Sequence, residues 1–535
     1  MAVLELLFLF SFLLTIPLLL RPVFVSKSET LLPPSPLALP IIGHFYLLGP
    51  LLHRSFYKLS LQFGPLFSLR FGSVPCIVVT SPEIAKEFLK THELSFISRA
   101  QTIAIERLTY NYSTPGFAPY GPYYKLIKKL SVNEFLSNRN VSNFASIRTQ
   151  EYLSLLRLLA KKAESGEAIN LTEELPRNFN NVIAKMMLGN SKGSSAEGRD
   201  EEARLVAREV TRIFGEFNLS DFVWFCKKLD LQGFGKRIEN THRRYDALME
   251  KVISEREELR KKNMKNGGGN VEEEMVLKDF LDVLLDLLEK GSGEIEGVKF
   301  TRVHIKALIM GFFTAGTDAT AILMEWALAE LINHPKVLKK VREEIDQAVG
   351  NKRLLVESDG PNLPYIQAVI KEACRLHPPV SVVTRKCVEK CKFGKYVIPE
   401  NTMLFVNVWG IGRDPKYWEN PLDFQPERFL SPPLSGGRDG TSALDVRGQH
   451  FELLPFGSGR RICPGVNLVM QMLPSLLGAM VQCFDWKVIG PQQKKMNGND
   501  LILEMDERPG MTTPRAHDLV CIPVARLNLL DVLDP

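Results

Sequence analysis

The sequence predicts a mainly α-helical protein with a small β component. Two observations predict this class: most of the chain has the apolar spacing of amphipathic helices, and residues 66–80 alternate as strands do. The alternating segment, LFSLRFGSVPCIVVT, predicts two strands joined by a turn near Gly72–Pro75. No linker-like stretch divides the rest, so residues 45–535 are expected to form one large domain. Exposed loops between helices are predicted at three polar, Gly-rich segments, 191–203, 260–275 and 431–444.

Composition excludes several classes of protein. Of the 535 residues, 45% are hydrophobic and 24% are charged, which is an ordinary globular balance and excludes disordered and fibrous chains. A net charge of +6 over this length is too small to predict nucleic-acid binding. The eight cysteines are scattered, so they predict no disulfide scaffold. Cys387 and Cys391 stand four residues apart, but no second pair or nearby histidine completes a zinc site.

The N-terminus predicts a membrane anchor. Residues 2–20 are almost continuously apolar, and a helix of this length spans roughly 28 Å, enough for the hydrocarbon core of a bilayer. A cleaved signal peptide is the alternative, but it would begin with basic residues, whereas here Arg21 and Lys27 follow the apolar run. Positive charge on that side predicts a single-pass anchor with the rest of the chain in the cytosol.

A proline-rich segment at 31–44, LLPPSPLALPIIGH, follows the predicted anchor. Its prolines favour an extended, stiff conformation, so it is interpreted as a hinge that holds the globular part at a fixed angle to the membrane. A linker of no special geometry is the alternative.

The most informative segment is 456–465, FGSGRRICPG, which has the pattern F-x-x-G-x-R-x-C-x-G. A lone cysteine is usually a small buried hydrophobe, but glycines on both sides let a thiolate approach a metal closely. The segment resembles the haem-binding signature of the cytochrome P-450 family. The resemblance implies that haem b (iron protoporphyrin IX) is the cofactor, that Cys463 is the axial iron ligand, and that Arg461 pairs with a propionate. It assigns further haem contacts to Phe456, Gly459, Gly465, Arg385, Tyr124 and Lys128.

Two more motifs support the resemblance to the cytochrome P-450 fold. Glu372 and Arg375 form E-x-x-R, which puts both side chains on one helix face. Residues 424–429, FQPERF, supply Arg428. In the family such residues form a buried ion network, which implies a structural role here. At Tyr124 the family usually has tryptophan; a phenol still donates a hydrogen bond, and the alternative is a plain core aromatic.

The segment 315–320, AGTDAT, lies within a helical stretch that in the family crosses above the haem. The resemblance implies that Asp318 relays protons during oxygen activation, and Thr320 is the second catalytic candidate. The family has Thr or Ser after the acid, whereas this chain has Ala319, and Thr320 points about 100° further around the helix. Three readings stay open: water or a substrate hydroxyl replaces the missing group, turnover leaks reduced oxygen, or the chain is an impaired paralogue.

Longer segments resemble a plant flavonoid branch of the family. GPLLHRSFYKLS and DVRGQHFELLPFGSGRRICPG are examples. This branch contains flavone synthase II, flavanone 2-hydroxylase and isoflavone synthase. In isoflavone synthases a lysine stands before the arginine of the loop after E-x-x-R, whereas HPPVSVVTRK has Thr384 before Arg385, as in the flavone-forming relatives. The resemblance implies NADPH- and O2-dependent oxidation of a flavanone such as naringenin, with flavone or 2-hydroxyflavanone as product. Gly311, where an Asp is usual, joins Tyr124 and Ala319 as a departure that concerns efficiency.

The resemblance also implies a substrate pocket and partners. The pocket residues it indicates are Phe313, Thr314, Ala315, Val382, Val383, Thr384, Met511 and Thr512. No G-x-G-x-x-G motif follows a strand, so electrons are expected from a membrane-bound NADPH–cytochrome P-450 reductase in the endoplasmic reticulum. A basic docking face for it is a candidate role for Lys125, Lys128, Lys129 and Arg460, with an ordinary solvated surface as the alternative. Two other classes remain: a haem-thiolate isomerase or dehydratase that needs no oxygen, and a non-catalytic haem protein.

Overall fold

The structure is a computed structural model that describes most of the chain. The described residues are 31–189, 194–223, 226, 230–266, 278–290, 297–430, 444–490, 493–495 and 501–533, together with Phe10, Ser11 and Thr15. The predicted anchor at 2–20 therefore lies almost wholly outside the described residues, as does nearly all of the loop predicted at 431–444.

The chain forms two compact units, each built from separate segments. Unit 1 comprises residues 1–100, 217–234 and 382–411, and unit 2 comprises residues 101–216, 235–381 and 412–535. Because the chain crosses between the units repeatedly, no composition shift in the sequence marks their boundary. Each unit is described by itself below.

Unit 1 holds a four-stranded sheet in the order β1-β2-β7-β4. The β2–β7 pair is parallel and the other two pairs are antiparallel. A separate two-stranded sheet pairs β5 with β6. The strands of unit 1 are β1 (Leu66–Phe71), β2 (Val74–Val79), β4 (Val383–Lys386), β5 (Cys391–Phe393), β6 (Tyr396–Ile398) and β7 (Met403–Val406). Its helices are η1 (Phe45–Leu47), α2 (Leu52–Phe63), α3 (Pro82–Lys86), η2 (Glu87–Thr91), α10 (Leu219–Phe222) and α16 (Val408–Ile411).

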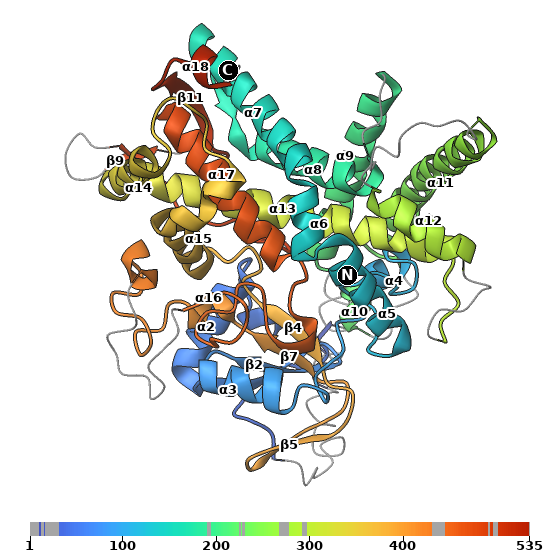
Figure 1. The fold of residues 1–535 in the computed structure, drawn as a ribbon. Coiled ribbons are helices and arrows are strands. Elements are labelled where there is room, and N and C mark those ends of the chain that lie inside the picture. The colour runs from blue at the N-terminus through green and yellow to red at the C-terminus, as the bar shows by residue number, and fades with distance from the viewer. Residues whose placement is uncertain are drawn as a thin grey trace, which may run out of the picture. The chain divides into compact units, whose positions relative to one another are not determined.

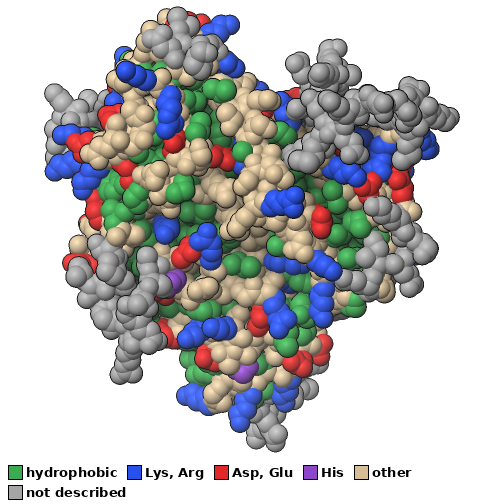
Figure 2. Space-filling model, viewed as in Figure 1, with side chains coloured by type: hydrophobic (Ala, Val, Ile, Leu, Met, Phe, Trp, Pro, Cys, Tyr) green, Lys and Arg blue, Asp and Glu red, His purple; other side chains and the backbone are tan. Residues whose placement is uncertain are grey.

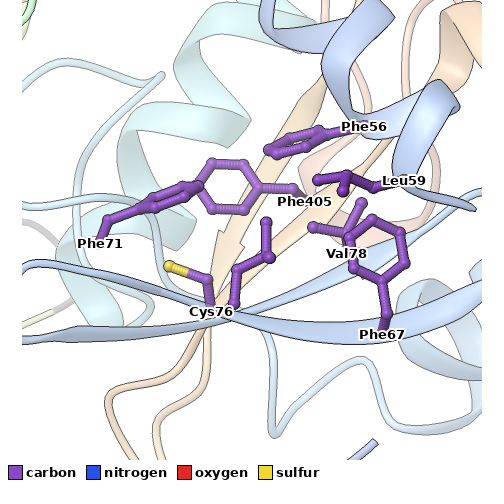
Figure 3. Close-up of a cluster of buried hydrophobic side chains, with 8 residues drawn as sticks. Phe56, Leu59, Phe67, Phe71, Cys76, Val78 and Phe405 are labelled. Carbon is purple, nitrogen blue, oxygen red and sulfur yellow. The ribbon is translucent and has the colours of Figure 1, made fainter. Parts of the chain in front are cut away.

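The strand pair predicted at 66–80 is confirmed. β1 and β2 pair from Leu66↔Val79 to Phe71↔Val74, and the turn between them contains Gly72 with φ +58°. A Cβ atom at Gly72 would also lie 2.4 Å from the carbonyl oxygen of Phe222. Both the backbone conformation and the lack of space therefore require glycine at this position. The sheet buries a cluster of apolar side chains from β1, β2, β7 and α2 (Figure 3): Phe56, Leu59, Phe67, Leu69, Phe71, Cys76, Val78 and Phe405.

The proline-rich segment is extended and docked along unit 1. The carbonyl oxygens of Pro33 and Pro34 accept hydrogen bonds from the hydroxyl and the amide of Ser68 on β1, both at 2.8 Å. His44 continues the contact, since its amide donates to the carbonyl oxygen of Arg70 at 2.8 Å. These bonds hold the segment along β1.

Unit 2 holds the long helices (Figure 1). Its strands are β3 (Ile169–Asn170), β8 (Phe484–Val488), β9 (Gln493–Lys495), β10 (Leu501–Leu503) and β11 (Val520–Ala525), paired as β3-β11-β8 and β9-β10. Its helices are α4 (Ile103–Leu108), α5 (Pro122–Leu130), η3 (Ser131–Phe135), α6 (Asn138–Asn143), α7 (Ala145–Ser165), α8 (Leu171–Leu188), α9 (Ser194–Gly215), α11 (Phe234–Asn266), α12 (Phe280–Lys290), α13 (Arg302–Asn333), α14 (Pro335–Ala348), η5 (Glu357–Asn362), α15 (Pro364–Leu376), η6 (Pro426–Phe429), η7 (Gly459–Arg461), α17 (Val466–Cys483) and α18 (Leu529–Leu533).

Helix α13 is the centre of unit 2, where α8, α9, α15 and α17 pack against it (Figure 1). Among the described residues, α13 and α17 are long and apolar enough to cross a membrane. Their most apolar windows are 67% and 78% buried inside the protein, however, which identifies them as core helices.

Two predicted loops are partly wrong. Helix α9 begins at Ser194, inside the loop predicted at 191–203, because its Glu, Ala and Arg residues are strong helix formers. The Glu201–Arg204 ion pair at i, i+3 (2.5 Å) supports this turn. Helix α11 continues to Asn266, the residue before the first glycine of the segment predicted as a loop at 260–275. Polar composition was mistaken for loop structure in both places.

Candidate active site

The cysteine loop, residues 456–465, contains η7, leads directly into α17 and folds back on itself. The amide of Cys463 donates to the carbonyl oxygen of Phe456 at 3.0 Å, and Gly459 has φ +68°, which glycine adopts without strain. Gly465 caps the N-terminus of α17, whose dipole favours negative charge on a nearby sulfur. Cys463 is exposed while the other seven cysteines are buried, so the loop presents this one thiol to a ligand.

Helix α5 holds the cysteine loop from one side. The hydroxyl of Tyr124 donates to the carbonyl oxygen of Arg460 at 2.8 Å, and Nζ of Lys128 donates to that of Ile462 at 2.8 Å. The guanidinium of Arg461 lies 3.8 Å from the centre of the Tyr124 ring and donates to the carbonyl oxygen of Ala118 at 2.6 Å. Burial lowers the pKa of Arg461, which indicates that this positive charge is costly unless an anion accompanies it.

The predicted ion network is present and buried. Arg375 uses all five of its N–H donors: two bind the carboxylate of Glu372, both at 2.7 Å, and three bind carbonyl oxygens at 2.6–3.0 Å. Those three carbonyl oxygens belong to Gly412, Pro421 and Asp423. Arg428 joins the network because its Nε donates to the carboxylate of Glu372 at 3.3 Å. The network ties α15 to residues 412–428, which supports its structural role.

Helix α13 is buried along most of its length but is open near its middle. Apart from Val303 in the first turn, Ala315 is its one exposed residue among 302–333. Thr314 uses its hydroxyl on the carbonyl oxygen of Met310 at 2.8 Å. Phe313 is 1% exposed and packs in the core, so it presents no surface to a ligand. The exposed position therefore coincides with the first alanine of AGTDAT.

Asp318 faces α9. Thr211 lies beside its carboxylate, and Arg208 and Arg204 add positive charge nearby. The hydroxyl of Thr211 donates to the carbonyl oxygen of Ala207 at 3.1 Å. Burial nevertheless raises the pKa of Asp318, which suits a group that takes up and releases a proton. Ala319 has no hydroxyl, and Thr320, which was predicted to share the catalytic work, is buried in the helix packing.

Four predicted residues lie on or beside β4 in unit 1. Strand alternation puts Val383 and Arg385, both buried, on one face and Thr384 on the other. The carbonyl oxygen of Thr384 accepts hydrogen bonds from Arg99 at 2.9 Å and from Arg385 at 3.0 Å. Val382 packs against the apolar cluster of Figure 3, so part of its surface belongs to the core of unit 1.

The remaining predicted pocket residues, Met511 and Thr512, lie at the tip of a loop before β11 in unit 2. Met511 is 41% exposed, which is unusual for a large apolar side chain and fits a ligand-facing position.

The residues of unit 2 fit a haem group. An exposed thiol, a buried guanidinium two residues before it, and an exposed alanine in an otherwise buried helix supply an iron ligand, a partner for a propionate and open surface. By contrast, within the part of the chain that the structure describes, no three His, Cys, Asp or Glu side chains are placed to hold a metal ion. Cys387 and Cys391 are both buried.

Comparison with known proteins identifies the class. Residues 33–513 match the family described as Cytochrome P450, and the chain belongs to this family of haem-containing monooxygenases. A zebrafish cytochrome P450 solved with progesterone has the same fold, with a TM-score of 0.71 at 24% identity over 89% of this chain and 100% of that one.

Relatives of higher sequence identity place the chain within one group of plant cytochromes P450, the group numbered 93. The chain is 52% identical to Cytochrome P450 93B16 of Glycine max over 95% of each chain. It is also 52% identical to Cytochrome P450 93B2 of Gerbera hybrida, over 100% of this chain and 99% of the relative. A 2-hydroxyisoflavanone synthase of Glycyrrhiza echinata is 49% identical over 96% of each chain. The protein is thus a plant cytochrome P450 monooxygenase of group 93, an oxidoreductase with haem as its cofactor.

Sequence reasoning missed the partners of Asp318. Thr211, Arg208 and Arg204 all lie on α9, part of which was taken for a loop. The i, i+4 and i, i+7 spacing of these three residues along one helix face was the signal that would have found them.

Proposed function

We propose that the protein is a flavone-forming monooxygenase of the flavone synthase II type, acting on a flavanone such as naringenin. The observation that carries the proposal is Thr384 before Arg385 on β4, where isoflavone-forming relatives have lysine. Relatives of 49% and 45% identity are named 2-hydroxyisoflavanone synthase and 3,9-dihydroxypterocarpan 6A-monooxygenase, which supports a flavonoid substrate.

The reaction balances with one reductant. The flavanone loses the hydrogens at C2 and C3, and O2, NADPH and a proton are consumed to give the flavone, two waters and NADP⁺. If oxidation stops at hydroxylation, one oxygen atom enters C2 and the other leaves as a single water.

Different residues of the chain would bind haem, transfer protons and contact the substrate. Haem supplies the oxygen activation, with Cys463 as its thiolate ligand and Arg461 as the partner of a propionate. Asp318 holds and moves the protons, with Thr211 beside its carboxylate. Ala315 and Met511 offer the exposed surface against which a flat aromatic substrate packs.

A second candidate is an isoflavone-type synthase or a flavanone 2-hydroxylase. It is favoured by the 49–50% identity to three 2-hydroxyisoflavanone synthases over more than nine-tenths of the chain. These reactions share substrate and reductant with flavone formation, so the product alone separates them.

The proposal also includes a membrane location and a reductase partner. Residues 2–20 would anchor the protein in the endoplasmic reticulum, in contact with lipid, with the catalytic domain in the cytosol. An NADPH–cytochrome P-450 reductase would dock near the cysteine loop. There Lys125 and Arg460 both lie against the ring of Tyr120, at 5.6 and 6.0 Å from its centre, and both are exposed together with Lys129. Basic and acidic side chains are interspersed elsewhere on the face shown in Figure 2.

The proposal is tested in yeast microsomes that contain a plant reductase. We expect naringenin to give the flavone only when NADPH is present, and Thr384→Lys to shift product towards the isoflavone series on chromatography against standards. Product without NADPH would indicate the isomerase or dehydratase class. An isoflavone product from the unaltered chain would favour the second candidate.

A further inference from the structure

The C-terminal loop, residues 506–516, is a closed hairpin in unit 2. The amide of Ala516 donates to the carbonyl oxygen of Asp506 at 2.7 Å, and the amide of Arg508 donates to that of Pro514 at 3.0 Å. The tip, residues 510–512, carries the exposed Met511. Because the two arms are bonded to each other, the tip moves with the hairpin as a whole.

The C-terminal loop is anchored at Thr513, the residue after its tip, to α13 and to the segment after α15. Nε1 of Trp326 donates to the carbonyl oxygen of Thr513 at 3.0 Å, and the amide of Thr513 donates to that of Pro379 at 2.8 Å. Trp326 is fully buried and its ring stacks on His377 with centroids 4.0 Å apart. This side of the loop therefore has little freedom to shift.

The tip of the C-terminal loop is held by a close approach at the end of α9. A Cβ atom at Gly215 would lie 2.4 Å from the amide nitrogen of Met511 and 3.0 Å from the carbonyl carbon of Gly510. Both neighbours are backbone, so no side-chain rotation relieves the overlap. Since carbon and nitrogen do not normally approach within roughly 3.4 Å, one added methyl group would displace the tip or the helix end by about 1 Å.

Gly215 lies on the face of α9 that looks towards the candidate active site. It follows Thr211 by four residues, which puts the two on the same helix face. Thr211 lies beside Asp318, and Asp318 follows the exposed Ala315 by three residues on α13. The close contact between Gly215 and Met511 is thus one helical turn from Thr211, the residue of α9 that lies beside the carboxylate of Asp318.

We propose that Gly215 is a positioning residue for the substrate. Its missing side chain lets the tip of the C-terminal loop close on α9, and this contact sets how far Met511 reaches towards the bound molecule. The identity of that molecule rests on the proposed function, whereas the role of Gly215 in placing the loop does not. A shift of about 1 Å at the reacting atoms changes rates up to 100-fold, enough to alter the choice between hydroxylation and desaturation.

The test uses Gly215→Ala in the full-length, haem-loaded protein. Gly360→Ala is the matched control, because a Cβ at Gly360 would meet nothing within 4 Å and its φ is not in the left-handed region. Three ligands are titrated spectroscopically: naringenin, 4-phenylimidazole, and plain imidazole as the small counterpart of 4-phenylimidazole. Hydrogen–deuterium exchange of residues 506–516 reads the loop without any ligand.

We expect Gly215→Ala to speed exchange in the C-terminal loop and to change the Kd of naringenin and of 4-phenylimidazole by about 10-fold, with imidazole unaffected. Gly360→Ala should match the unaltered protein in every readout. If naringenin fails to bind the unaltered protein, the proposed substrate is wrong, and 4-phenylimidazole and the exchange rates still decide the role of Gly215.

Unchanged exchange and unchanged Kd values in Gly215→Ala would overturn the proposal. Should that variant fail to take up haem, Met511→Ala decides instead, since it removes the side chain whose position Gly215 is proposed to set. An unaltered Kd for both larger ligands in Met511→Ala would overturn the proposal equally. Where both variants fold, their effects should not add, because they act on one contact.

Discussion

Arg375→Lys tests the buried ion network most sharply. Arg375 is fully buried and uses five N–H donors, whereas lysine has three, so at least two acceptors lose their partner. A lost hydrogen bond costs roughly 1 kcal/mol at a neutral acceptor and about 1.5–3 kcal/mol at a charged one. The expected loss of unfolding free energy is therefore about 2–4 kcal/mol, a large share of the roughly 5–15 kcal/mol that proteins possess.

The assay is urea denaturation of the haem-loaded protein, followed by circular dichroism and by the reduced carbon-monoxide spectrum. The matched control is Arg353→Lys. Arg353 also binds a carboxylate through two N–H groups, at 2.7 and 2.8 Å from Asp359, but it is exposed. Such a surface pair is worth at most about 1 kcal/mol. Equal denaturation midpoints for the two variants would refute the reasoning that burial makes the Arg375 network costly to break.

Three further predictions address chemistry, pH and haem retention. Ala319→Thr should raise the amount of product formed per NADPH consumed by about 3- to 10-fold, because it restores roughly one hydrogen bond. An unchanged ratio would show that the missing hydroxyl does not limit turnover. Burial raises the pKa of Glu325 to about 7, although Arg515 opposes the shift. The folded state therefore holds an extra proton, and stability should fall as pH rises from about 4.5 to 7. Glu325→Gln should remove that slope, worth up to roughly 3 kcal/mol, in urea titrations at several pH values. Tyr124→Phe removes the 2.8 Å hydrogen bond to the carbonyl oxygen of Arg460, which contributes about 1 kcal/mol. The variant should therefore release haem to apomyoglobin about fivefold faster. An unchanged rate would assign Tyr124 a packing role only.

The cysteine loop was predictable because its pattern is local. Phe456, Gly459, Cys463 and Gly465 are fixed by close backbone approach within ten residues, and that constraint is written directly in the sequence. The same holds for the strand pair β1–β2, where alternation and a turn glycine act over a few positions.

Long-range contacts were not predictable from the chain alone. The contact between Gly215 and Met511 joins residues nearly 300 positions apart, and nothing in the sequence near either residue marks it. Phe313 shows the converse limit. Its proximity to AGTDAT suggested a pocket residue, but it stands two residues before the exposed Ala315, about 200° around the helix, and is buried in the core. The start of α9 was missed because charged residues favour loops and solvated helix faces alike.

The central claim is that a thiolate-ligated haem in this chain oxidises a flavanone by desaturation. The most direct measurement is the product mass after incubation with naringenin, NADPH, a plant reductase and ¹⁸O2. The account predicts a product lighter than naringenin by two hydrogens that contains no ¹⁸O. A product that retains one ¹⁸O atom, or no product from protein whose reduced carbon-monoxide spectrum shows an intact thiolate-ligated haem, would contradict it.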